Sequence, residues 1–144
     1  MDSNNINYLL KNILCNKQVY FSGVYASDQI PKSFTYYPAC FVVNIDPSNL
    51  PGTHWVCYYF PDKSRCEFFD SYGKGPNVFN LPVYSNMYHN TIRYQSDYSN
   101  VCGQYCIYYL YWRSKGHSPS QIKINLQSSH NPDNLVTVCL TFTI

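Results

Sequence analysis

Four residues of this chain carry side chains that could act together in a hydrolytic reaction: His54, Asp70, Gln95 and Cys102. Each stands at the edge of a segment that reads as strand or helix. A thiolate can attack a carbonyl carbon, and an imidazole can accept and return the proton. A carboxylate can orient the imidazole, and a neutral amide can donate a hydrogen bond to the oxyanion. These residue types, in this order, predict nucleophilic catalysis by a cysteine.

The segment that begins at Cys102 has the spacing of a helix. Apolar and aromatic residues recur at helical spacing as far as Leu110, and Gly116 is placed to end the helix. The unpaired N–H groups and the dipole at a helix N-terminus favour a thiolate. We expect Gly103 to leave room for a substrate backbone. Taken alone, Cys102 would be interpreted as a buried structural thiol. The presence of His54 in the same chain favours a catalytic role for it instead.

A hairpin is expected to bring His54 and Asp70 together. Residues 54–60 and 65–70 are rich in aromatic and β-branched types, and residues 61–64 read as the turn between them. Antiparallel strands joined by a short turn place the start of the first beside the end of the second. The reading therefore puts the imidazole and the carboxylate at one end of a sheet.

The whole pattern predicts one α+β domain over residues 1–144, without a linker, a repeat or a second domain. We expect a mixed, mostly antiparallel sheet flanked by helices, with Cys102 at the N-terminus of a buried helix. The other expected elements are a helix at 6–14 capped by Asp2 or Ser3, strands at 39–45 and 90–95, a helix from 118 to about 126, a β-prone end at 135–144, and loops at 19–34 and 73–82.

Composition excludes several classes of function. The chain is 12% charged with a formal net charge of +2, which is weak support for a nucleic-acid partner. No apolar run approaches the roughly 20 residues that span a bilayer, and the N-terminus lacks the pattern of a signal peptide, so we expect neither a membrane partner nor secretion. The 16 tyrosines favour a tyrosine-rich core edge over a tyrosine-lined substrate groove.

The seven cysteines indicate reduced thiols rather than a metal site. The sequence has no Cys-x-x-Cys pair, the usual mark of a zinc site, and no signal peptide that would place it in an oxidising compartment. We therefore predict no bound metal. Most of these thiols read as small buried hydrophobes, among them Cys57 and Cys66 within strand-like runs.

With these motifs in view, the chain resembles the adenain family of adenovirus-type cysteine endopeptidases, in the clan shared with SUMO and ubiquitin-like proteases. Gly-Thr-His54-Trp55 is similar to the family's His-Trp motif, and Phe-Asp70-Ser-Tyr-Gly to its acidic motif, where adenain has Glu and clan relatives have Asp. Gln95 lies seven residues before Cys102, as in adenain, and Cys102-Gly103-Gln-Tyr-Cys resembles the nucleophile motif. Residues 20–25, 39–44 and 130–135 add weaker matches.

The resemblance implies a thiol endopeptidase that cleaves precursor proteins after small residues, Gly above all, during virion maturation or in a transposon of the Polinton/Maverick type. It implies a triad of Cys102, His54 and Asp70, an oxyanion hole of Gln95 and the Cys102 backbone N–H, and Trp55 shielding the imidazole. The implied setting is the host nucleus or cytoplasm, or the virion, and the enzyme is expected to be a monomer.

Two departures from the family bear on activation and size. Adenain joins a peptide cofactor through a cysteine shortly before its glutamine, and residues 84–90 here contain no Cys. A peptide or DNA activator stays open by resemblance, but we expect no disulfide-linked one and no other cofactor. The chain is also shorter than adenain, and we expect it to lack much of the family's C-terminal helical region.

Three alternatives remain at this point. A protease that removes SUMO or ubiquitin-like proteins would have the same fold, but those relatives generally carry Asp before the nucleophile, where this chain has Val101. An inactive binding module on the same fold would not need all four site residues. A metal site built from Cys102, Cys106 and a histidine lacks a convincing fourth ligand.

Overall fold

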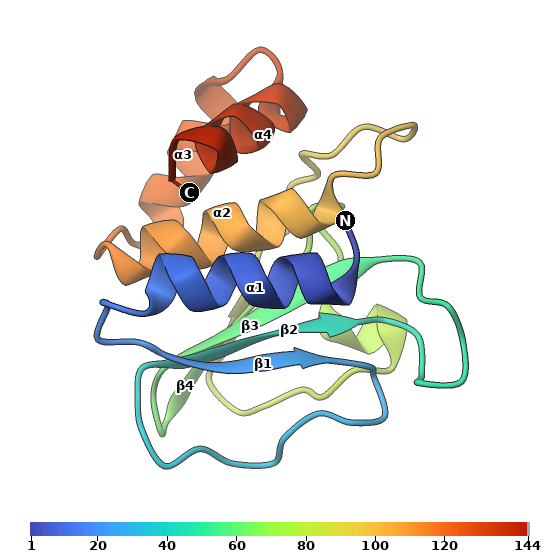
Figure 1. Ribbon diagram of the computed structural model, residues 1–144, viewed down its shortest axis with the longest axis vertical. Coiled ribbons are helices and arrows are strands. Elements are labelled where there is room, and N and C mark those ends of the chain that lie inside the picture. The colour runs from blue at the N-terminus through green and yellow to red at the C-terminus, as the bar shows by residue number, and fades with distance from the viewer. Residues whose placement is uncertain (144) are drawn as a thin grey trace.

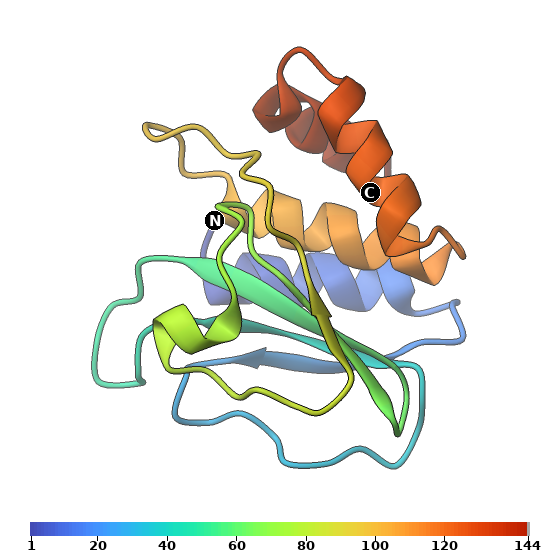
Figure 2. The ribbon, with the colours of Figure 1, turned by 180° about the vertical axis from the view of Figure 1, so that it is seen from behind.

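The computed structural model describes residues 1–143 and contains one five-stranded sheet in the order β1-β2-β3-β4-β5. Helices α1 and α2 lie across one face of the sheet, and α3 and α4 lie beyond α2 on the side away from the strands (Figures 1 and 2). The elements are α1 (Ser3–Leu14), β1 (Tyr20–Tyr25), β2 (Ala39–Asn44), β3 (Trp55–Asp62), β4 (Arg65–Phe69), the 3-10 helix η1 (Pro76–Phe79), β5 (Met87–His89), α2 (Cys102–Ser114), α3 (Pro119–Ser128) and α4 (Pro132–Thr143).

The sheet is mixed, as the sequence predicts. The two central pairs, β2 with β3 and β3 with β4, are antiparallel, whereas the outer pairs, β1 with β2 and β4 with β5, are parallel. The predicted hairpin is therefore confirmed as β3 and β4. The α+β class and the position of Cys102 at the first residue of the buried helix α2 are also confirmed.

Both faces of the central strands are covered. On β3, Cys57 and Tyr59 pack with the helices, whereas Val56 and Tyr58 pack into a second cluster on the opposite face. Burial on both faces explains why β2 reads as a continuous apolar run rather than an alternating one. Many tyrosines serve this packing: Tyr58 and Tyr105, for example, have no exposed surface.

A buried ion pair fixes α2 on the sheet. The Arg113 guanidinium, near the end of α2, makes two hydrogen bonds of 2.8 Å to the Glu67 carboxylate on β4. The Tyr109 hydroxyl donates to the same carboxylate at 2.7 Å. A bidentate guanidinium–carboxylate contact fixes both the orientation of the two groups and the distance between them. It therefore sets the position of the helix whose other end carries Cys102.

The predicted loop at 19–34 contains a strand instead. Residues 20–25 form β1, which pairs in parallel with β2 and has a register shift between Phe21 and Gly23. Gly23 has a φ of +147°, a conformation that L side chains rarely adopt. The structure uses this glycine inside an edge strand beside an irregularity, a place where glycine is common.

The predicted strand at 90–95 is displaced toward the N-terminus. The observed strand is β5, and residues 90–95 form a loop that folds back onto the segment after β4. The Asn90 side chain takes the place of a ladder contact, because its carboxamide accepts from the Asp70 N–H at 3.0 Å and donates to the Asp70 carbonyl at 2.6 Å. The β-prone residues after Asn90 therefore lie in a loop, in which the N–H groups of Tyr94 and Gln95 donate to the Ser71 carbonyl.

The β-prone end at 135–144 is wrong as a strand, because residues 132–143 form α4. Asn131 accepts a hydrogen bond from the Asn134 N–H at 3.1 Å, which caps the helix, and Pro132 suits its first turn. Val136 is buried against α2, so packing on a helix overrides the β-branched composition. Ile144 lies outside the described residues.

Candidate active site

The β3–β4 hairpin brings His54 and Asp70 into direct contact. His54 immediately precedes β3 and Asp70 immediately follows β4, and Cys57 pairs with Phe69 in the ladder between them. The His54 Nε2 atom lies 2.6 Å from Asp70 Oδ1. The imidazole is 6% exposed and the carboxylate has no exposed surface, so water does not compete for this contact. The two residues meet at the end of the sheet where the sequence predicted them.

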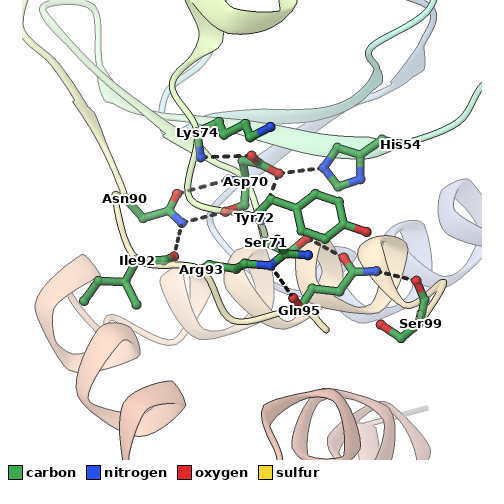
Figure 3. A network of polar contacts seen from close by, with 10 residues as sticks. All are labelled: His54, Asp70, Ser71, Tyr72, Lys74, Asn90, Ile92, Arg93, Gln95 and Ser99. Carbon is green, nitrogen blue, oxygen red and sulfur yellow. Dashed lines mark hydrogen bonds and ion pairs between the residues drawn. The ribbon is translucent and has the colours of Figure 1, made fainter. Parts of the chain in front are cut away.

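Asp70 is held on every side by hydrogen bonds (Figure 3). The backbone N–H of Tyr72 donates to its Oδ1 at 3.2 Å, and that of Lys74 donates to its Oδ2 at 3.0 Å. The Asn90 carboxamide bridges the Asp70 backbone from the neighbouring loop. These donors neutralise the buried carboxylate and fix the direction of the oxygen that faces His54. Asn90 is a supporting residue that sequence reasoning missed, because it lies in the segment read as a strand.

The imidazole is covered by an aromatic ring. Tyr72 stacks on His54 with ring centroids 4.7 Å apart. The Arg93 guanidinium lies over the Tyr72 ring, 4.6 Å from its centroid. Trp55, predicted to shield the imidazole, donates from Nε1 to the Met1 carbonyl at 3.2 Å. The ring in contact with the imidazole is thus Tyr72, and the shielding role of Trp55 remains a prediction.

Cys102 completes the arrangement from the N-terminus of α2. Its side chain is buried and lies beside the His54 side chain. Because Nε2 of His54 faces Asp70, Nδ1 is the ring nitrogen left for the thiol. The backbone N–H groups of Trp55 and Gly103 also stabilise the sulfur. The structure therefore brings three of the four predicted residues into one chain of contacts.

The electrostatics of this chain favour charge separation. Burial alone would lower the pKa of His54, but its hydrogen bonds to Asp70 and Cys102 and their charges raise it to about 9. Burial would raise the pKa of Cys102, but the hydrogen bonds from His54, Trp55 and Gly103 outweigh it and lower that pKa below its usual value. A raised imidazole pKa beside a lowered thiol pKa favours a thiolate that faces an imidazolium. This is the state that a nucleophilic cysteine requires.

Gln95 is fixed between the other site segments. Its Oε1 accepts from the Ser71 hydroxyl at 2.6 Å, and its Nε2 donates to the Ser99 carbonyl at 3.0 Å. The side chain is 2% exposed. Ser71 follows Asp70 and Ser99 lies three residues before Cys102, so the carboxamide is anchored to both. One Nε2 hydrogen remains for an oxyanion, and that role is a prediction.

Gly103 has a different use from the one expected. A Cβ atom at this position would lie 3.2 Å from Ile6 Cδ1 and 3.3 Å from Met1 Sδ. The missing side chain therefore lets α1 pack against the first turn of α2, instead of leaving room for a substrate backbone. The close approach places the N-terminus of the chain beside the start of α2, as both ribbon views show (Figures 1 and 2).

An open cleft of about 780 Å³ reaches Cys102. Its walls come from the start of α1, the end of β1 and the loop between β2 and β3, and they include Trp55. Carboxylates of Asp2 and Asp46 line it, whereas no lysine or arginine among the described residues does. Its size suits several residues of an extended peptide.

Other kinds of site find no support in the described chain. Within residues 1–143, no three His, Cys, Asp or Glu side chains are grouped so that they could hold a metal ion. None of the described helices has the length and apolar character needed to cross a membrane. The cysteines are free thiols, and Cys102 is the one placed beside a histidine and a carboxylate.

Comparison with solved structures identifies a protein with a similar fold. No protein-family model matches the sequence, and no curated protein matches it. Among solved structures, the chain is similar to the selenomethionine crystal structure of the ASFV pS273R protease, with a TM-score of 0.65 and 15% sequence identity. The match covers 97% of this chain and 66% of that protease, so the chain spans about two thirds of its length. The chain therefore has the fold of this protease.

Proposed function

We propose that this chain is a cysteine endopeptidase of the clan that holds adenain and the SUMO and ubiquitin-like proteases. The observation that carries the proposal is the buried line of contacts from Asp70 through His54 to Cys102, at the N-terminus of α2. The fold shared with the ASFV pS273R protease supports the same class of chemistry. A structural thiol would need neither the carboxylate behind the imidazole nor the open cleft in front.

In the proposed mechanism, the Cys102 thiolate attacks the carbonyl carbon of the scissile peptide bond. The developing oxyanion accepts hydrogen bonds from the Cys102 backbone N–H and from Gln95 Nε2. The His54 imidazolium gives its proton to the departing amine as the C–N bond breaks, which leaves a thioester on Cys102. His54 then takes a proton from water, the hydroxide displaces the thiolate, and the acid product leaves. Asp70 keeps the ring oriented throughout.

The proposed substrates are precursor proteins of a virus or a transposon, cleaved after glycine. The resemblance implies a narrow channel lined by aromatic side chains, which would select a residue without a side chain at the scissile bond. The proposed enzyme needs no metal or disulfide-linked activator and acts as a monomer inside the host cell or the virion. The support for these proposals is the resemblance of the motifs around His54 and Cys102 to those of the adenain family.

The test compares short peptides with folded fusions. Peptides with an apolar residue followed by x-Gly-Gly or x-Gly-x should be cleaved with a kcat/KM comparable to that for whole precursors, because the cleft reads an extended segment. SUMO and ubiquitin fused to a reporter provide the matched folded substrates. A preference of about a hundredfold for a fusion would assign the chain to the deconjugating branch, whose specificity depends on a broad interface. Absence of cleavage in all substrates would contradict the proposal.

A further inference from the structure

The cleft in front of Cys102 contains a buried amide that the chemistry above does not use. Asn44, at the end of β2, lines the cleft and is 7% exposed. It pairs with Trp55 across the antiparallel ladder, so both side chains project from the same face of the sheet. This face is the one on which Cys102 lies.

The carboxamide of Asn44 is oriented by the chain and has a donor to spare. Its Oδ1 accepts from the Asp46 N–H at 3.0 Å, which leaves Nδ2 as the free end. None of the described residues accepts a hydrogen bond from Nδ2. The Nδ2 atom itself is not sealed from solvent, so it can donate a hydrogen bond to a group that enters the cleft. The acceptor that an extended peptide offers at regular intervals is its backbone carbonyl.

A glycine lets this amide pack closely against the loop between β2 and β3. Gly52 also lines the cleft, and a Cβ atom there would lie 2.5 Å from Asn44 Nδ2. Its φ of +88° is a conformation that favours glycine. Any larger residue would collide with the carboxamide and displace it. The cleft, the fixed amide with its free donor and the adjacent nucleophile therefore point to a bound backbone segment.

The rim of the cleft near Asn44 is acidic. Asp46 uses Oδ2 to accept from the Thr53 hydroxyl at 2.8 Å, and Asp2 uses Oδ1 to accept from the Asn5 N–H at 2.9 Å. The second oxygen of each carboxylate has no hydrogen-bond donor among residues 1–143. The cationic group in the lining is the α-ammonium of Met1, so two carboxylates stand against one ammonium, and the cleft is negative although the whole chain carries a net charge of +2.

We propose that this cleft selects substrates with a basic side chain near the scissile bond: Asn44 Nδ2 donates to a substrate carbonyl, and Asp46 and Asp2 attract the arginine or lysine. The inference rests on the proposed function, since it names the substrate class of the same site. Asn44 is a positioning residue of the bound peptide, and the two carboxylates determine specificity. Because the carboxylates are partly or fully exposed, each should contribute about two- to fivefold in affinity, and less as salt rises.

The experiment measures peptide binding to the Cys102→Ala variant, in which turnover cannot interfere. Fluorescent peptides with a central Gly-Gly carry, at one flanking position at a time, arginine or its neutral isostere citrulline. At one or two positions, arginine should bind about five- to twentyfold more tightly. Asp46→Asn should reduce this ratio two- to fivefold, and so should Asp2→Asn, which preserves the helix cap. Asp62→Asn at the far end of β3 is the matched control and should leave the ratio unchanged.

The amide has its own test in the active protein. Asn44→Asp keeps an acceptor for the Asp46 N–H but removes the donor, so KM should rise about tenfold for the neutral citrulline peptides, with a smaller change in kcat. A purely structural role would alter the thermal midpoint and kcat and leave KM unchanged. An arginine-to-citrulline ratio within twofold at every position, or one that survives Asp2→Asn combined with Asp46→Asn, would overturn the inference.

The two proposals fail in different ways. Wild-type cleavage of citrulline peptides without any preference for arginine would refute the basic specificity and leave the peptidase standing. Tight, Asp46-dependent binding of arginine peptides that are never cleaved would refute the peptidase and leave the cleft as a binding site for basic peptides.

Discussion

Replacing Asp70 by asparagine should separate the electrostatic support of His54 from its packing. The carboxylate is fully buried and lies 2.6 Å from His54 Nε2. An asparagine has the same size, so the stack of Tyr72 on the imidazole and the hairpin should persist. Its amide cannot serve the site equally well, because an NH₂ group would face either the Lys74 N–H or the imidazole. The change therefore removes a charge and disturbs the ring orientation.

The size of the effect follows from the pKa of His54. That pKa lies at about 9, against an ordinary value of 6.5, although burial alone would lower it. The difference of 9 − 6.5 corresponds to roughly 3 kcal/mol in favour of the imidazolium. Asp70 and Cys102 share this stabilisation, so the variant should lose about 1–3 kcal/mol. The population of the thiolate–imidazolium pair near pH 7 should fall by roughly 10- to 100-fold.

Alkylation of Cys102 reports this population directly. The rate of reaction with iodoacetamide should be measured from pH 5 to 10 for the wild type and for Asp70→Asn, with circular dichroism to show that both are folded. The variant should react about 10- to 100-fold more slowly at pH 7, and the two profiles should converge at high pH, where any thiol is ionised. Identical profiles in two folded proteins would refute the electrostatic role assigned to Asp70.

Three further predictions follow from the structure. Gln95→Ala should lower kcat by roughly 10²–10³ with a smaller effect on KM, and an unchanged kcat would place the oxyanion donor elsewhere. Activity should fall on the alkaline side as His54 loses its proton near pH 9; the stability that this group contributes is complete below pH 6.5 and is lost as pH rises through about 9, which denaturation at several pH values can check. Arg113→Met should lower the free energy of unfolding by about 3–5 kcal/mol, because the Glu67 carboxylate would stay buried without its partner, and a loss below about 1 kcal/mol would show that water reaches Glu67.

The sequence predicts the hairpin well because both of its signals are local. Alternating aromatic and β-branched residues flank a four-residue turn, and antiparallel geometry then places His54 beside Asp70. The helix that begins at Cys102 is equally well defined, because its start and its stop at Gly116 are both marked in the sequence. The contacts of these two units account for three of the four candidate site residues.

Long-range packing accounts for what the sequence did not predict. Whether residues 20–25 form a strand depends on β2, which offers them a parallel partner, and local composition carries no record of that. Residues 132–143 are β-prone but form α4, because a capped helix can bury Val136 against α2. The role of Asn90 under Asp70 and that of Met1 beside Gly103 join segments far apart in the chain, so no local pattern indicates them.

The central claim, that Cys102 is the nucleophile of a peptidase, is tested most directly by selective labelling coupled to activity. Brief treatment with iodoacetamide near neutral pH, followed by peptide mapping of all seven cysteines, gives the order in which the thiols react. Cys102 should react before the exposed Cys15 although it is itself buried, and the loss of peptidase activity should parallel its labelling one to one. Labelling of Cys15 or Cys139 first, together with activity that survives in Cys102→Ala, would contradict the account.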